Sequence, residues 1–454
     1  MATDPVPDHD AISSRISPTC PADTQQLLTA SWSHDLAALK RLLALPGRAS
    51  NSSSCRDPQT GETPLHAAIR SCGPRLEAGQ DDDDDEAKAR TTVHELFLSG
   101  AIWNDVDDRD ETPGCVALRL GRTALYDLCV EAGARAEMLF GLLGGYEELE
   151  SGSDEEMGNG GDDAEVEVEN ENGLGTVAEL DDDNGEEAPQ LVEADDATAA
   201  VAQEGAEFVS PPKGDEGGVT SEEYLRSRLT YSDGKLVDDE RNGVMMAWET
   251  DIMRRSVDAL LPGRQPGKRI LNIGLGMGII DAMFAETAPA RHHIIEAHPE
   301  VLEHLSGPDA EFGARWESGA PAPGAYKVHH GRWQDVCPRL LREGEVYDAI
   351  YFDTFGEDYG QLRKFFTEYV VGLLEQDGVF GFFNGLGADR RICYDVYTKV
   401  VEMHLVDAGL DVDWQVVDVD LKGLEEAGKG EWEGVRRRYW TLDKYRLPVC
   451  TFLG

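Results

Sequence analysis

A glycine turn and a nearby carboxylate mark the part of this chain that could do chemistry. The turn 274–278 reads Gly-Leu-Gly-Met-Gly and follows the apolar run 269–273, and a second apolar run, 293–295, ends on Glu296. Glycines let a backbone approach a ligand without an intervening Cβ, and an acid at the tip of the next strand can accept both hydroxyls of a ribose. The segment 268–300 therefore predicts a strand, a turn, a helix and a strand that bind a nucleoside.

The spacing of the glycines helps to distinguish two nucleoside cofactors. A dinucleotide fingerprint reads GxGxxG, whereas here Ile279 fills the last position and the third glycine comes one residue early, at Gly278. The GxGxG form suits S-adenosylmethionine, which has no phosphate to bind. The motif alone leaves other nucleotide-binding folds and a simple packing turn open.

Alternating strand-like and helical segments follow the turn. Strand-like runs at 327–330, 347–352 and 378–383 predict strands, and 357–376 and 388–408 predict helices. Strands that alternate with helices indicate a parallel, doubly wound sheet. Ligands of such sheets lie beyond the carboxyl ends of the strands, where the strand order reverses.

Four segments end predicted strands, and we expect them to meet in one crevice. They are the glycine turn, Glu296, Arg332 with Trp333, and Asp353 with Thr354.

Five motifs resemble, in order, those of guanidinoacetate methyltransferase and of its protein-modifying relative, the arginine delta-nitrogen (type IV) methyltransferase. They are VMMAWET at 244–250, GLGMGI at 274–279, IIEA at 294–297, GRWQD at 331–335 and YFDT at 351–354. The resemblance spans about 220–454. It implies an α/β fold, that of a class I S-adenosylmethionine-dependent methyltransferase with a doubly wound, mostly parallel sheet, preceded by an all-α ankyrin-like module.

The chemistry implied is methyl transfer to a guanidine nitrogen. A guanidinium group is a poor nucleophile because its pKa exceeds 12 and its lone pairs are delocalised. Carboxylates can bind its planar fork and accept a proton as the new bond forms. The expected catalytic residues are Asp353, at the end of the fourth strand, and Glu249, in the WET motif. In the resembled family, the acids of these two motifs bind the guanidino group together.

The resemblance also implies the cofactor-binding residues. The glycine turn would hold the methionine end, Glu296 the ribose, and Trp333 would stack on the adenine, whereas Met245 and Met253 are equally compatible with plain core positions. The full set is Tyr224, Met245, Met253, Gly274, Leu275, Gly276, Met277, Gly278, Ile279, Glu296, Ala297, His298, Arg332, Trp333 and Asp353. Tyr439 and Trp440, in a segment resembling the family's closing hairpin, would shape the arginine entrance.

The front of the chain carries ankyrin-like signatures. Residues 63–68 read TPLHAA, the signature that opens an ankyrin repeat, and 110–118 is a degenerate copy. Segments 33–43 and 93–100 are typical of second helices, and 123–140 is expected to cap two to three imperfect repeats. We predict a module at 25–146 behind a disordered N-terminus at 1–24, with Asp81 to Asp85 in a looped insertion.

An acidic tract separates the two modules. Residues 147–216 contain 25 Asp and Glu against one Lys, within a chain of net charge −47. The tract can bury too little apolar surface to offset the entropy lost on ordering. We therefore expect it to be a disordered linker, either a spacer or a docking tail for basic partners. Proteolysis should cut there first and release a stable methyltransferase domain, 217–454, that binds the cofactor as tightly as the full chain.

The composition indicates which cellular compartment and which kinds of partner to expect. No apolar run of 18 residues and no basic, apolar leader is present, so neither a membrane span nor a secretory signal is expected. Eight cysteines without a CxxC pair indicate reduced thiols and no metal site, in the cytoplasm and nucleus. The negative charge favours cationic partners over nucleic acid, and we expect a monomer.

These observations favour S-adenosylmethionine-dependent methylation of arginine in a protein. In the resembled family the delta-nitrogen is modified and the substrate is a ribosomal large-subunit protein, but spacing does not reveal which nitrogen reacts. Three alternatives remain: a small-molecule guanidinoacetate methyltransferase, an NAD-dependent enzyme, which Ile279 disfavours, and a non-catalytic ankyrin adaptor, which the acids Glu249, Glu296 and Asp353 disfavour.

Overall fold

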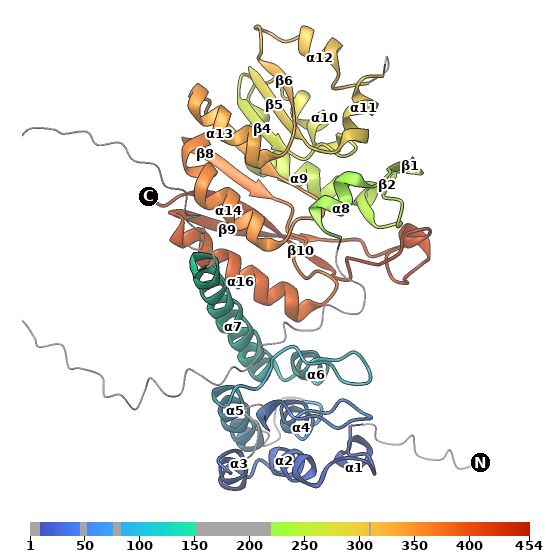
Figure 1. The fold of residues 1–454 in the computed structure, drawn as a ribbon, viewed down its shortest axis with the longest axis vertical. Helices are drawn as coiled ribbons and strands as arrows, with labels where there is room; N and C mark the ends of the chain where they lie inside the picture. The colour runs from blue at the N-terminus through green and yellow to red at the C-terminus, as the bar shows by residue number, and fades with distance from the viewer. Residues whose placement is uncertain (1–9, 46–51, 76–82, 151–218, 308–309) are drawn as a thin grey trace, which may run out of the picture. The chain divides into compact units, whose positions relative to one another are not determined.

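The computed structural model describes residues 10–45, 52–75, 83–150, 219–307 and 310–454 (Figure 1). Residues 151–216 of the expected acidic linker lie outside the described residues, as do Asp81 and Asp82. By their contacts, the described residues up to Leu139 and those from 219 onward belong to one compact unit. No helix among the described residues is long and apolar enough to cross a membrane.

The front helical module, residues 10–139, consists of three helix pairs behind a short first helix. The elements are α1 Ile12–Arg15, α2 Ala22–Trp32, α3 Leu36–Leu43, α4 Pro64–Arg70, α5 Asp83–Leu98, α6 Pro113–Arg119 and α7 Thr123–Glu150. The first helices of successive pairs pack on each other, α2 on α4 and α4 on α6, and α2 and α4 also contact their partners α3 and α5. Asp83 to Asp85 open α5, so this part of the acidic run is helical rather than an insertion loop.

Two turns in this module are conformational copies of each other. Thr63 and Thr112 each cap a helix with the side-chain oxygen, and each is followed by proline at the first helical position. Asp110 has φ +59°, where the preceding turn has Gly61 at φ +66°. The degenerate second copy expected from the sequence therefore repeats the backbone conformation of the first.

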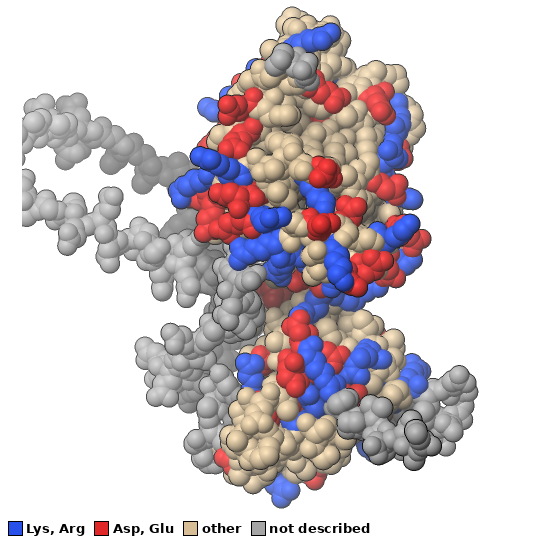
Figure 2. All heavy atoms as spheres, turned by 90° about the vertical axis from the view of Figure 1, so that its right-hand side faces the viewer, with Lys and Arg blue, Asp and Glu red and all other residues tan. Residues whose placement is uncertain are grey.

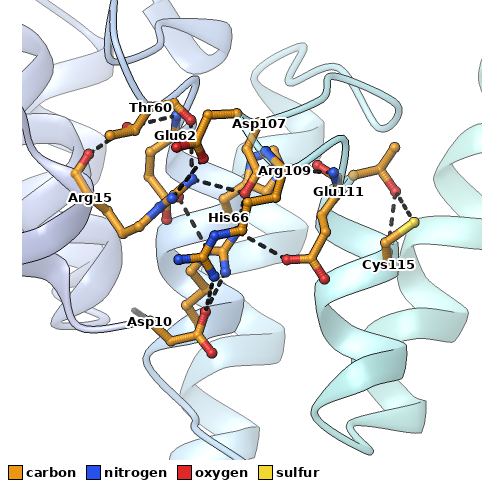
Figure 3. A network of polar contacts seen from close by, with 12 residues as sticks. Asp10, Arg15, Thr60, Glu62, His66, Asp107, Arg109, Glu111 and Cys115 are labelled. Atoms are coloured by element: carbon orange, nitrogen blue, oxygen red, sulfur yellow. Dashed lines mark hydrogen bonds and ion pairs between the residues drawn. The ribbon is translucent and has the colours of Figure 1, made fainter. Parts of the chain in front are cut away.

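A buried ionic network joins these turns to α1 (Figure 3). Arg15 donates to Glu62 at 2.9 Å and to Asp107 at 2.8 Å, and Arg70 pairs with the same two acids. All four side chains are at most 2% exposed, and breaking such a buried pair is costly because it leaves a charge without its partner. The expectation of disorder at 1–24 is therefore wrong for residues 10–24.

The C-terminal domain is built on a seven-stranded sheet of order β6-β5-β4-β7-β8-β10-β9 (Figure 1). Its strands are β4 Arg269–Ile273, β5 Arg291–Glu296, β6 Tyr326–His330, β7 Tyr347–Phe352, β8 Leu374–Phe382, β9 Leu410–Asp418 and β10 Lys444–Phe452. The first five run parallel, and β10 lies antiparallel between β8 and β9. The order reverses between β4 and β7, whose carboxyl ends therefore open a crevice.

Helices cover the sheet and a small antiparallel sheet precedes it. The helices are α8 Ser221–Arg226, α9 Thr250–Leu260, α10 Ile279–Ala285, α11 Pro299–Leu305, α12 Ala314–Ser318, α13 Trp333–Glu343, α14 Tyr359–Phe365, α15 Val371–Leu373 and α16 Arg391–Asp407. The small sheet contains β1 Thr230–Ser232, β2 Lys235–Val237 and β3 Gly243–Met246. Predicted helix 357–376 is interrupted by a π-helical turn at Phe366–Val370 and ends at Leu373.

Helix α16 is shared by two hydrophobic cores. Ile392, Val396 and Val400, four residues apart, are buried in the core of the front helical module. Val401 and Leu405 are buried in the core of the large sheet. The front helical module and the C-terminal domain are thus joined by apolar packing as well as by the chain.

Removal of residues 1–216 should therefore destabilise the rest of the chain. The cut exposes Ile392, Val396 and Val400, and each buried aliphatic side chain contributes about 1.5–3 kcal/mol. We expect the fragment 217–454 to unfold at a lower temperature than the full chain and to regain stability when the three residues are changed to Ser or Thr. An unchanged melting temperature would instead restore the sequence-based expectation of an independently stable domain.

Candidate active site

The glycine turn after β4 is shaped by close backbone contacts. Gly274 has φ +93°, and a Cβ there would lie 1.9 Å from the carbonyl oxygen of Asp353. Gly276 has φ +54°, and a Cβ there would lie 2.7 Å from Cε of Met245. Any larger residue would push the turn away from β7 and fill the crevice.

Glu296 ends β5 and anchors this turn. Glu296 is 5% exposed, and its carboxylate accepts the backbone N–H groups of Leu275 at 2.9 Å, Gly276 at 3.3 Å and His298 at 2.6 Å. Burial raises the pKa of Glu296, and these backbone donors oppose that shift. The carboxylate of Glu296 thus fixes the conformation of the glycine turn, and Glu296 also lines a pocket.

A first pocket lies beyond the carboxyl ends of β4, β5, β6 and β7. Its volume is about 610 Å³, including its open mouth. Predicted cofactor residues that line it are Tyr224, Met245, Gly274, Gly276, Glu296, Ala297, Arg332, Trp333 and Asp353. Residues that we did not predict for the cofactor also line it, among them Ser221, Gln334, Phe355 and Glu357. The four strand-end segments do meet in one crevice.

Several predicted cofactor residues lie outside the pocket lining. Met253 is fully buried in a core cluster with Val257 and Ile280, because α9 turns this position toward the sheet. Ile279 also packs on that cluster, and Leu275 is 2% exposed with its side chain in another. For Met253 the plain core alternative fits the structure, and the side chains of Leu275 and Ile279 also pack in the core instead of lining the pocket.

The other three stabilise the walls of the pocket. The Met277 N–H donates to Sδ of Met245 at 3.3 Å, and Gly278 caps α10 in the left-handed conformation. The His298 ring hydrogen-bonds the carbonyl oxygen of Tyr224 at 2.9 Å. Through that bond, the segment that follows β5 holds α8 and Tyr224 against the pocket.

Trp333 does not present an open stacking face. The residue is 3% exposed, and its ring packs edge-on against Phe352 and Phe365. Its Nε1–H donates to Glu357, which also accepts from Gln334 and Thr354. Trp333 therefore positions Glu357 at the pocket wall, a contact that nothing in the motif signals.

A second, wider pocket shares a wall with the first. It measures about 1650 Å³ including its open mouth, and Glu249 and Tyr439 line it. Val244, Asp353, Thr354, Phe355 and Glu357 line both pockets. Asp353 follows β7 directly and so faces the cofactor crevice on one side and the second pocket on the other.

Glu249 is a buried acid, not a surface helical residue. It is 5% exposed at the start of α9, where the backbone N–H of Met246 donates to it at 3.3 Å. The hydroxyl of Tyr439 donates to its other oxygen. Trp440, by contrast, is fully buried and donates to the carbonyl of Leu442, so it shapes the core and not the entrance.

The surroundings of the two carboxylates, Glu249 and Asp353, favour the binding of a cation. Burial and then the nearby charge of Asp353 raise the pKa of Glu249 to about 8, and burial raises the pKa of Asp353 to about 7. Among the described residues, no Lys or Arg forms an ion pair with either acid. An arriving guanidinium would supply the missing positive charge and lower both pKa values.

Activity should accordingly rise with pH. Both acids must be ionised to bind a guanidinium, so we expect kcat/KM to increase through about pH 7 to 8.

The stability of the folded chain should instead decrease as pH rises. The folded pKa values exceed those of about 4 in an unfolded chain, so this contribution is complete below pH 4 and is lost as pH rises through 7 and 8. Melting temperatures from pH 5 to 9 should therefore fall less for Glu249→Gln than for the parent chain, and parallel curves would contradict the shift.

The charged surface shows no concentrated basic region on its visible side. On the face drawn in Figure 2, Lys and Arg are interspersed with Asp and Glu over the described residues. Within the same residues, no group of three or more His, Cys, Asp or Glu is arranged to hold a metal ion.

Comparison with known proteins places the chain in a family. The model of the guanidinoacetate N-methyltransferase family matches residues 232–419. Protein arginine N-methyltransferase 2 of Neurospora crassa is 62% identical over 98% of this chain and 100% of its own length. Its namesake in Gibberella zeae is 60% identical over 96% and 93%. A crystal structure of Aeropyrum pernix fibrillarin with bound S-adenosyl-L-methionine aligns with a TM-score of 0.29 at 14% identity, over 50% of this chain and 83% of that one.

The strand order, the antiparallel β10, the glycine turn and the acid at the end of β5 define a class I S-adenosylmethionine-dependent methyltransferase. The chain belongs to the protein arginine N-methyltransferase 2 family.

Proposed function

We propose that this enzyme methylates the delta-nitrogen of an arginine side chain in a protein, with the guanidino group held by Glu249 and Asp353. The observation that carries the proposal is the shared wall between the two pockets, where Asp353 faces both. A cofactor in the first pocket and an arginine in the second would meet at this carboxylate.

The residues of the first pocket fit S-adenosylmethionine. The turn at Gly274 and Gly276 leaves room where a Cβ would collide, and Glu296 offers a buried carboxylate for ribose hydroxyls. When bound, the cofactor supplies a methyl group activated by its sulfonium charge. The absence of a phosphate-binding third glycine at Ile279 disfavours a dinucleotide.

The chain's own residues would bind and deprotonate the substrate. Glu249 and Asp353 are positioned to accept hydrogen bonds from the guanidinium and to hold it in one orientation. As the nitrogen forms its bond to carbon, it loses one proton, and Asp353 accepts it because its raised pKa suits a general base near neutral pH. Tyr439 keeps Glu249 turned toward the pocket.

The choice of nitrogen and of substrate rests on the family resemblance. We propose a ribosomal large-subunit protein as the substrate, as the resembled family implies. The net charge of −47 is compatible with such a basic substrate, because a negative chain attracts cationic partners. We further propose that the enzyme acts as a monomer in the cytoplasm and nucleus. The repeated Thr-Pro turns support an ankyrin-like assignment for the front helical module.

One experiment tests the activity, the nitrogen and the substrate together. The enzyme is incubated with labelled S-adenosylmethionine and a ribosomal extract, and the labelled residue is identified by fragmentation mass spectrometry. We expect delta-monomethylarginine in a large-subunit protein. Label on a terminal nitrogen would contradict the regiochemistry, and turnover of free guanidinoacetate without protein labelling would favour the small-molecule alternative.

A further inference from the structure

The segment 385–389 forms one rim of the second pocket and leads directly into α16. Here we propose that the front helical module completes this pocket: through Asp110 and Arg390 it holds the rim in the conformation that receives the substrate arginine. This inference rests on the proposed function of the pocket, and it makes Arg390 a positioning residue.

The contact between the front helical module and α16 is a built interface. A Cβ on Gly133 of α7 would lie 2.7 Å from Cγ2 of Val396 and 2.9 Å from the ring of Trp103. Gly133 sits inside a helix, where alanine would ordinarily be more favourable by about 1 kcal/mol. Close packing against α16 therefore gives a reason for glycine at this position. A Cβ on Gly114 of α6 would likewise meet the side chain of Ile392.

Polar contacts surround this apolar interface. The hydroxyl of Tyr126 donates to Asp395 at 2.5 Å, and that of Tyr397 donates to Glu137 at 3.4 Å. Both bonds join α7 to α16, so they fix the rotation of α16 about its own axis as well as its distance.

One contact of the front helical module reaches Arg390, the residue that directly follows the pocket rim. The Arg390 guanidinium donates from Nη1 to the carbonyl oxygen of Asp110 and from Nη2 to its carboxylate, both at 2.8 Å. Asp110 is the left-handed residue of the second Thr-Pro turn, and that turn is tied into the buried network through Asp107. Arg390 is thus hydrogen-bonded to a turn that the buried network of the front helical module holds in place.

Movement of Arg390 would be transmitted to the pocket. Its N–H donates to the carbonyl oxygen of Gly387 at 3.1 Å, and Gly387 and Asp389 line the second pocket. Gly387 has φ +65°, and a Cβ there would lie 2.7 Å from Cβ of Cys393 in α16. The rim is therefore packed against the first turn of α16 and follows its position.

Kinetics of two matched variants test the positioning role. Asp110→Gly keeps the left-handed backbone but removes the carboxylate, whereas Asp110→Asn keeps an acceptor oxygen. We expect Asp110→Gly to raise KM for the protein substrate about three- to tenfold, with kcat and the Kd for S-adenosylmethionine within twofold. Asp110→Asn should stay near the parent values, and so should Glu131→Ala, which breaks an exposed ion pair on α7.

A double-mutant cycle and hydrogen exchange make the test decisive. Arg390→Ala removes the bonds to both the carbonyl oxygen and the carboxylate of Asp110, so it should raise KM at least as much as Asp110→Gly. The double variant should be little worse than Arg390→Ala alone, because the carboxylate then has no bond to Arg390 left to lose. Amide exchange of the peptide around 385–390, measured without substrate, should accelerate in Asp110→Gly and stay slow in Asp110→Asn. If the parent chain methylates no protein, the proposed function fails while exchange still tests the contact. Unchanged exchange and unchanged KM in an active enzyme would overturn the inference.

Discussion

Replacing Asp353 by Asn is expected to reduce methyl transfer by about 10² to 10⁴ while the affinity for S-adenosylmethionine stays within a few-fold. The amide keeps the shape of the side chain but loses its charge and its ability to accept the substrate proton. The effect should be largest above pH 8, where the parent carboxylate is ionised, because its pKa is raised to about 7. Single-turnover rates at saturating cofactor, together with cofactor titration by calorimetry, separate the chemical step from binding.

The matched variants are Glu249→Gln and Tyr439→Phe. Glu249→Gln removes the second carboxylate and should lower the rate by a similar factor. Tyr439→Phe removes only the hydroxyl donor to Glu249, so it should have a much smaller effect and move the alkaline rise of kcat/KM to higher pH. Near-normal turnover of Asp353→Asn would show that this acid does not serve the guanidine, and the methyl acceptor would have to be a group that ionises unaided.

Residues at strand ends were predictable because parallel strands place their carboxyl ends along one edge. Gly274, Glu296 and Asp353 each follow or end an apolar run, and all three line the first pocket. The glycine spacing added the choice of cofactor. For this part of the site, local pattern and sheet geometry were enough.

Residues on helices were harder to assign because a motif does not give the rotation of its helix. Met253 lies four residues beyond Glu249 on α9, yet it faces the core whereas Glu249 faces the second pocket. Trp333 starts α13, and its ring packs in an aromatic core, so it reaches the first pocket only as part of the wall. Only packing against the sheet decides these orientations.

Contacts between distant segments were beyond sequence reasoning. Tyr439 and Glu249 are 190 positions apart, and the order of α1 depends on Arg15 reaching Glu62 and Asp107. The apolar stripe of α16 was compatible with an ordinary core helix, so its second partner, the front helical module, became visible only in the fold.

Replacing Glu296 by Ala should weaken S-adenosylmethionine binding at least tenfold. Each hydroxyl-to-carboxylate bond contributes about 1.5 to 3 kcal/mol, and 1.4 kcal/mol already corresponds to tenfold in Kd. The structure adds a second reason. Without the carboxylate, the N–H groups of Leu275 and Gly276 lose their buried acceptor, so the glycine turn loses its anchor before any cofactor arrives.

Glu296→Gln separates these two contributions. Its amide oxygen can still accept from the turn, while the charge that favours ribose hydroxyls is gone and one oxygen is replaced by a donor facing the His298 N–H. We expect cofactor affinity between those of the parent and Glu296→Ala, with a melting temperature closer to the parent. In both variants the rate at saturating cofactor should fall far less than in Asp353→Asn, because Glu296 binds and does not react. A Glu296→Ala enzyme with parental cofactor affinity would mean that the ribose lies elsewhere, and the first pocket would then need another occupant.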